Sequence, residues 1–287
     1  MRLVAAALAT SALALASCGG DGEPEPPREP PAELLRTAAA NPPASGEAEL
    51  ALDAVLEGDS LLAGRAGVAL QGTFARRPGG GLARFDLALD GELAGFGVDG
   101  AVVSTGEDVY VVFFGENYRL GPERAEALER SLDDASPQGI AGLGLLFADW
   151  LRDPRYGEVE EIAGEHAVRI EGRLDAAAMA EDLGQLGASL GAPSLLAELA
   201  AGARSGPAEA WIGLDSHALL GVRAQFPFRV PAERRAATGG VESGVAVLES
   251  RVTKTGITPS FEPPPGGGFQ PIDDLTGRLQ SLAGLAF

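Results

Sequence analysis

An alternation of apolar and polar residues with a period of two is the feature of this sequence that most restricts its fold. It begins at Glu47 and returns in three runs, at 48–56, 66–74 and 83–89. Because successive side chains of a strand point to opposite faces of a sheet, this pattern is typical of strands with one buried and one solvated face. Gly, Asp and Pro residues between the runs favour tight turns. We therefore predict neighbouring antiparallel strands.

The elements after the third run complete the predicted fold. Further strands are expected at 96–104 and 109–114, as a pair within 158–174, and at 208–214, 219–230 and 241–255. Helices are expected at 122–132, 139–151, 176–190 and 194–203. Strands and helices thus come in blocks, an order that predicts an α+β fold with one antiparallel sheet and helices gathered on one face.

The first 17 residues have the composition of a signal peptide. Met1 and Arg2 are followed by small and apolar residues up to Ala16, and residues 15–18 read Leu-Ala-Ser-Cys. This tetrapeptide resembles the lipobox of bacterial lipoproteins, in which the cysteine becomes lipid-modified after cleavage. Cys18 is the only cysteine of the chain. We predict that Cys18 is a lipid attachment site; a buried or incidental cysteine is the alternative.

Two Pro-rich segments frame the strand region. Residues 18–46 carry Gly, Pro and Glu with few large apolar side chains, which favours a flexible tether with a short helical turn near its end. The folded domain is expected at 47–255, followed by a Pro/Gly linker at 256–271. In the last segment, 272–287, apolar residues recur every three or four positions, which predicts an amphipathic helix.

Charge and histidine content exclude several functions. With 22 basic and 41 acidic residues the net charge is −19, whereas nucleic-acid binding requires Lys and Arg to neutralise phosphates. The chain has two histidines, His166 and His217, so a zinc or iron centre built on His and Cys is not expected. We predict no cofactor and no metal site.

Two motif matches are expected to be structural. Residues 187–191 fit the G-x-S-x-G pattern of serine hydrolases, and Asp215 and His217 follow in the matching order. Ser189, however, falls at the end of a predicted helix instead of after a buried strand. Residues 95–100 fit G-x-G-x-x-G, but a strand follows where phosphate binding requires a helix. We predict no catalytic residue, and the protein is not expected to be an enzyme.

Three longer phrases occur in a characteristic order. They are GEDVYVVFFGENYRL at 106–120, FADWLRDPRYGEVEEIAGEHAVRIEGRLDAAAMAEDL at 147–183 and AEAWIGLDSHALLGVRAQF at 208–226. In this order they resemble the LolA-like superfamily, in particular lipoproteins of the LppX/LprG type. The resemblance implies a curved half-barrel sheet whose concave face is covered by helices, around an apolar cavity that takes acyl chains. Members share no catalytic motif, so the resemblance implies no catalytic residue.

The residues themselves are compatible with two kinds of interior. Small residues beside large ones on the inward strand faces allow either a hollow or a space filled by Ala- and Leu-rich helices. For the hollow, the candidate lining residues are Leu50, Leu52, Val68, Leu70, Phe85, Leu87, Val111 and Phe113 from strands and Leu143, Phe147 and Trp150 from a helix.

The leading hypothesis is an envelope lipoprotein, anchored on the extracytoplasmic face of the cell membrane, that binds lipid, with transport of the bound lipid as an additional role. The alternative is a non-enzymatic interaction module of the same fold without a working lipid cavity, which binds another envelope protein. The expected partners are the membrane, through the lipid anchor, and a lipid ligand. Nucleic acid is excluded, and we expect a monomer.

Overall fold

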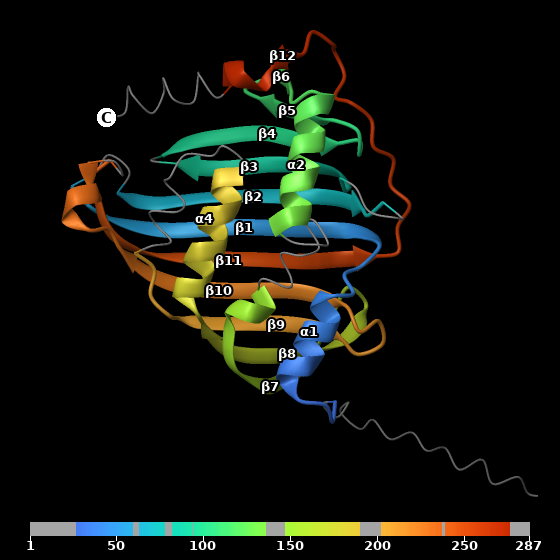
Figure 1. Ribbon diagram of the computed structural model, residues 1–287, viewed down its shortest axis with the longest axis vertical. Helices are drawn as coiled ribbons and strands as arrows, with labels where there is room; N and C mark the ends of the chain where they lie inside the picture. The colour runs from blue at the N-terminus through green and yellow to red at the C-terminus, as the bar shows by residue number, and fades with distance from the viewer. Residues whose placement is uncertain are drawn as a thin grey trace, which may run out of the picture.

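The alternating runs form the centre of one large sheet (Figure 1). The structure, a computed structural model, describes residues 27–59, 63–77, 82–93, 95–135, 147–189, 202–236 and 239–275. Within these residues the sheet has 12 strands in the order β12-β6-β5-β4-β3-β2-β1-β11-β10-β9-β8-β7. The strands are β1 (Ser45–Gly58), β2 (Gly64–Ala75), β3 (Arg84–Leu93), β4 (Phe96–Ser104), β5 (Val109–Phe113), β6 (Glu116–Arg119), β7 (Leu151–Ile162), β8 (Glu165–Leu174), β9 (Pro207–Gly213), β10 (Leu219–Arg229), β11 (Val241–Thr255) and β12 (Gln270–Pro271).

Neighbouring strands are antiparallel, apart from the short β12, which runs parallel to β6. Strands β1 to β6 form a meander. The chain then leaves the sheet and returns at the opposite edge with β7 to β10, and β11 closes the gap by pairing with β10 and β1. The fold is therefore mostly β, with few helices. The predicted single sheet is confirmed, but helices make up a smaller part of the domain than the α+β prediction implied.

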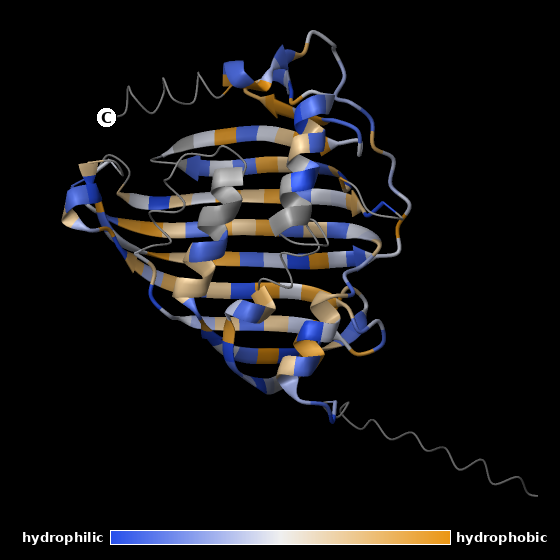
Figure 2. Cartoon of the chain, viewed as in Figure 1, coloured by the Kyte–Doolittle hydropathy of each residue, from blue (hydrophilic) through white to orange (hydrophobic). Residues whose placement is uncertain are grey.

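Helices of the described residues lie in front of one face of the sheet, which we call the inner face (Figure 1). They include α1 (Pro31–Ala39), α2 (Pro122–Ala135), α4 (Ala176–Ser189) and the helical residues 147–150; a 3-10 turn spans Ala232–Arg234. Helix α1 contacts β7, β9 and β10, and α2 contacts α4. Along the strands in Figure 2, hydrophobic and hydrophilic residues alternate, as the period of two requires. Among the helices of the described residues, none combines the length and apolar character needed to cross a membrane.

Helix α1 lies inside the range expected to be a tether, 18–46. Pro31 starts the helix, where the missing N–H of proline costs no hydrogen bond. Leu34, Leu35 and Ala38 recur on one side and are at most 2% exposed, in the same core cluster as β8 and β9 residues. The C-terminal part of the expected tether is therefore packed onto the sheet.

Other boundaries differ from the predictions for identifiable reasons. The helix predicted at 139–151 is present at 147–150, but Leu151 already belongs to β7; 136–146 lie outside the described residues. At the end of the helix predicted for 194–203, Ala203 instead forms a bridge with Phe228. Strands β6 and β12 were not predicted because each is too short to show a period. In each case a partner distant in sequence, not local propensity, decides the conformation.

Candidate functional site

The strand register places all eight strand residues of the candidate set on the inner face. Leu52 lies opposite Val68, and Leu50 opposite Leu70. The pairing of the next strands continues this face through Phe85 and Leu87 of β3, and then through β4, to Val111 and Phe113 of β5. Leu52 packs against the cluster that holds helix residues, so this face is the one that carries the helices. The sequence alternation thus assembles one continuous apolar surface over β1 to β5.

The inner face has two halves that differ in packing. Over β8 and β9 the apolar side chains are sealed: Val168, Ile170 and Ile212 are 0% exposed. Over β1 to β5 they are not. Leu50 is 40% and Val68 39% exposed, and Leu52, Leu70, Phe85, Leu87, Val111 and Phe113 are half-buried. We call the inner face of β1 to β5, defined by these eight residues, the open apolar face.

The helical candidates do not share this exposure. Phe147 and Trp150 are 2% and 4% exposed and belong to the sealed core cluster, with their rings edge-to-face at 6.4 Å. Leu143 and Cys18 lie outside the described residues. The structure therefore gathers the strand candidates into one surface and assigns Phe147 and Trp150 to the packing of the other half.

Polar contacts in the N-terminal turns of α4 hold this helix over the inner face. The Asp175 carboxylate accepts N–H bonds from Ala177 and Ala178, both at 3.1 Å, and also binds Arg152 at 2.8 Å. The Ala178 N–H first, and the Arg152 guanidinium next, hold the pKa of Asp175 below its ordinary value. One turn on, the Trp150 indole donates to Asp182 at 2.7 Å. These bonds tie the start of the helix to β7 and to Trp150.

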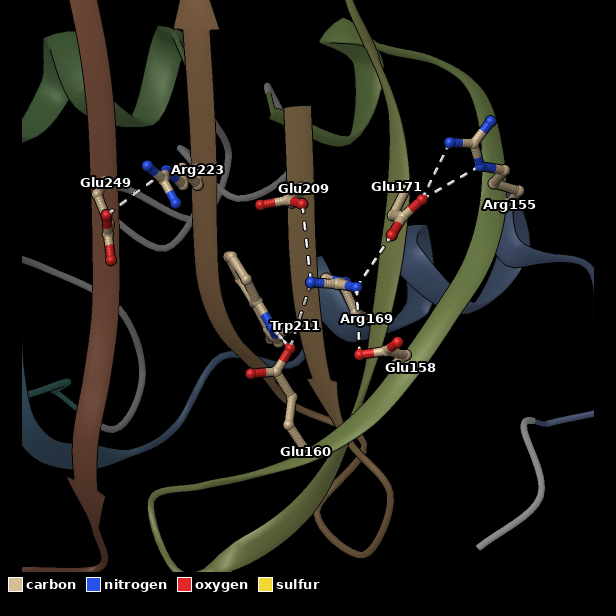
Figure 3. A network of polar contacts seen from close by, with 9 residues as sticks. All are labelled: Arg155, Glu158, Glu160, Arg169, Glu171, Glu209, Trp211, Arg223 and Glu249. Carbon is tan, nitrogen blue, oxygen red and sulfur yellow. Dashed lines mark hydrogen bonds and ion pairs between the residues drawn. The ribbon is translucent and has the colours of Figure 1, made fainter. Parts of the chain in front are cut away.

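The outer face of β7 to β9 carries a charged network (Figure 3). Arg169 lies within ion-pair distance of Glu171 at 3.1 Å, and of Glu158, Glu160 and Glu209 at 3.7, 3.8 and 3.9 Å. The Trp211 indole donates to Glu160 at 2.7 Å. One guanidinium thus offsets part of the repulsion among four carboxylates. The network is on the opposite side of the sheet from the open apolar face.

The structure places the residues of the two motif matches at a helix end and in turns. Ser189 is the last residue of α4. His217 is exposed in a turn with φ of 52°, and its Nδ1 faces the Asp215 backbone carbonyl. Gly95, with φ of 80°, forms the turn between β3 and β4, and a strand follows it. Among the described residues no group of three or more His, Cys, Asp or Glu side chains is arranged to hold a metal ion.

The outer face has a hollow that the sequence did not predict. Its volume is about 850 Å³, and it lies over β1, β2, β3 and β11. Val55 and Val245 within it are 50% and 37% exposed. Small residues at Ala51, Gly67 and Ala69 leave this space. In the sequence these small residues alternate with the inward-facing leucines, and this alternation could have predicted the hollow.

The fold and the open face define the class of this chain: a mostly-β protein with one large sheet, helices over one face, and part of that face left accessible. No protein-family model matches the sequence, and no curated protein matches it either. Solved structures do match, and the structural similarity predicted from the three sequence phrases is confirmed by them.

Three of the similar structures cover about four fifths of this chain. LprF from Mycobacterium bovis aligns with a TM-score of 0.41 at 14% identity, over 83% of this chain and 99% of LprF. The Mycobacterium tuberculosis lipoprotein LppX aligns at 0.33 and 17%, over 79% of this chain and 97% of LppX. A LolA superfamily protein from Nitrosomonas europaea aligns at 0.24 and 11%, over 80% of this chain and 94% of that protein.

Proposed function

We propose that this protein is an envelope lipoprotein that binds an acyl chain of a lipid against the open apolar face. The observation that carries the proposal is the contrast within one face of one sheet. Val168 in β8 is 0% exposed, whereas Val68 in β2 is 39% exposed although both point to the helix side. An apolar surface that the protein's own side chains do not bury is the expected state of a lipid site without its lipid.

The chemistry of the face suits a hydrocarbon chain. Each methylene removed from water contributes about 0.8 kcal/mol, so ten buried methylenes contribute about 8 kcal/mol before the cost of association. This gain needs no charged clamp. The eight residues of the face are aliphatic or aromatic, which matches a ligand recognised by its chain and not by its head group.

The remaining parts of the proposal concern location and shape. Cys18 would carry the lipid anchor on the extracytoplasmic side of the membrane, and residues up to Pro30 would separate the domain from the bilayer. The sheet would curve around the bound chain as a half-barrel, with α2 and α4 on its concave side. Transport between membranes would follow if the bound lipid exchanges.

A pair of variants on one strand tests the binding site. Leu87 faces the open apolar face, while its neighbour Ala88 is exposed on the other side of β3. Leu87→Glu places a charge against the acyl chain and is expected to lower affinity for a fluorescent fatty acid at least tenfold, because burying an unpaired carboxylate is costly. Ala88→Glu adds the same charge to the outer face and is expected to bind as the wild type does.

Native mass spectrometry of the purified chain supplies a second measurement. The wild type is expected to retain a lipid adduct that organic extraction removes and that Leu87→Glu lacks. Absence of any adduct, together with no fatty-acid binding after extraction, would contradict the proposal. Equal loss of binding in Leu87→Glu and Ala88→Glu would place the ligand elsewhere.

A further inference from the structure

The segment after β11 ties together the two borders of the open apolar face. Strand β11 lies at one side of β1, and β6 lies beyond β5, so five strands separate them. Residues 257–271 run from the end of β11 to the far edge, where β12 pairs with β6 (Figure 1). This segment, which we call the strap, therefore connects one border of the face to the other.

Contacts at several points hold the strap in place. At its start the Ser45 hydroxyl donates to the Ile257 carbonyl at 2.6 Å. The Arg84 guanidinium lies 5.4 Å from the centre of the Phe261 ring. Near its end Phe269 packs on Tyr110 with ring centres 5.0 Å apart, and Tyr110 is only 9% exposed. The strap is thus a packed part of the domain and not a free linker.

Beyond β12 the chain reaches helix α2. Both guanidinium nitrogens Nη1 and Nη2 of Arg124, in α2, bind the two carboxylate oxygens of Asp273, each at 2.8 Å. This two-pronged geometry is the most specific one for a guanidinium and a carboxylate. The bond to Arg124 lowers the pKa of Asp273, and the bond to Asp273 raises the pKa of Arg124.

Helix α2 also contacts α4, and its Ala125 packs against Leu82 and Val109. Of its side chains that the structure describes, Ala125 alone is buried. The turn before the helix is held by Asp108, which accepts the Gly121 N–H at 2.9 Å. The body of α2 crosses in front of β1 to β4, over the open apolar face (Figure 1). A helix that packs on the sheet through one buried alanine, with its other described side chains exposed or half-buried, can move away at little cost.

We propose that the strap latches α2 over the open apolar face through Arg124 and Asp273, and that this latch sets the rate at which lipid enters and leaves. The inference rests on the proposed lipid-binding function. Because Arg124 and Asp273 do not line the face, breaking the latch changes the rates of binding and release together and leaves the equilibrium affinity nearly constant.

Stopped-flow fluorescence with a fluorescent fatty acid tests the latch in the full domain. Arg124→Gln and Asp273→Asn are each expected to speed both uptake and release about threefold, the size of effect that an exposed but well-aligned ion pair supports. The charge exchange Arg124→Asp with Asp273→Arg is expected to restore slow exchange. High salt should accelerate the wild type and leave Asp273→Asn unchanged, since screening acts on the pair.

The chain offers a matched control on the outer face. Arg155 makes a similar exposed pair with Glu171 at 3.0 Å, so Arg155→Gln removes the same kind of contact without touching α2 or the strap. Its exchange rates are expected to equal those of the wild type. Equal rates in Arg124→Gln and the wild type, or the same acceleration in Arg155→Gln, would overturn the latch.

Two other outcomes separate the latch from the function on which it rests. A drop in affinity with unchanged association rate would show that Arg124 belongs to the binding site itself, which also overturns the latch. If the wild type binds no lipid in the same assay, the proposed function fails and the gating role fails with it. If it binds lipid but the variants exchange at the wild-type rate, only the latch is wrong.

Discussion

Replacing one valine by alanine in each half of the inner face should have very different costs. Val168 of β8 is 0% exposed in the sealed core, and Val68 of β2 is 39% exposed on the open apolar face. Both replacements remove two methyl groups from a strand residue on the same side of the sheet. Differences in strand propensity therefore largely cancel, and packing decides the result.

The expected magnitudes follow from the exposed fractions. At Val168, two lost methyl groups cost about 1.6 kcal/mol of transfer free energy. A residual cavity of about 50 Å³ adds roughly 1.2 kcal/mol, for a total near 3 kcal/mol. At Val68, about three fifths of the transfer term applies and no enclosed cavity forms, which gives about 1 kcal/mol. The two variants should thus differ by about 2 kcal/mol in free energy of unfolding.

Urea unfolding of lipid-free protein, followed by the fluorescence of Trp150 and Trp211, measures both values. Saturating fatty acid should then increase the cost of Val68→Ala, because contacts with the ligand are lost, and leave that of Val168→Ala unchanged. Equal costs without lipid, within about 0.5 kcal/mol, would mean that the two halves are packed alike. The argument for an open binding surface would then be refuted.

Three further predictions concern the scaffold. Gly206→Ala would place a Cβ 1.9 Å from the Gln225 carbonyl oxygen, so it should destabilise by about 3 kcal/mol in thermal unfolding. Gly97→Ala, with nothing within 4 Å, serves as its control. Arg169→Met leaves four carboxylates facing one another and should cost roughly 2 kcal/mol, partly recovered in high salt; an unchanged melting temperature would contradict the network's role. Because the folded-state pKa of Asp175 is lowered, its stabilisation exists above the ordinary pKa and disappears as the pH falls through the lowered value. Asp175→Asn should therefore melt earlier at pH 7 and show a weaker further loss below pH 3.8, whereas an acid profile identical to the wild type's would exclude this linkage.

Much of the sheet could be predicted from the sequence. The period of two located β1 to β5 within a few residues and also determined which side chains share a face, because a one-residue shift would turn every leucine outward. The glycine turns between the strands set the meander. The extents of α2 and α4 were likewise predicted within a few residues.

Other features depend on contacts between distant segments. A four-residue strand such as β6 has no period of its own, and it forms because β5 offers it a free edge. Helix α1 has the composition of a tether, yet Leu34 and Leu35 find buried positions over β7 and β9. The strap has a linker's Pro and Gly content, yet the packing of Phe261 on Arg84 and of Phe269 on Tyr110 helps to make it a fixed connection.

The sequence by itself determined that an apolar inner surface exists and which residues form it, since alternation is a local property of the chain. Whether that surface is covered was decided only by the tertiary structure. Val68 and Val168 have the same side chain and face the same side, yet 39% of one and none of the other is exposed. The difference comes from where α1, 147–150 and α4 settle relative to the sheet. Burial depends on atoms brought in from elsewhere in the chain, and no pattern of neighbouring residues encodes their position.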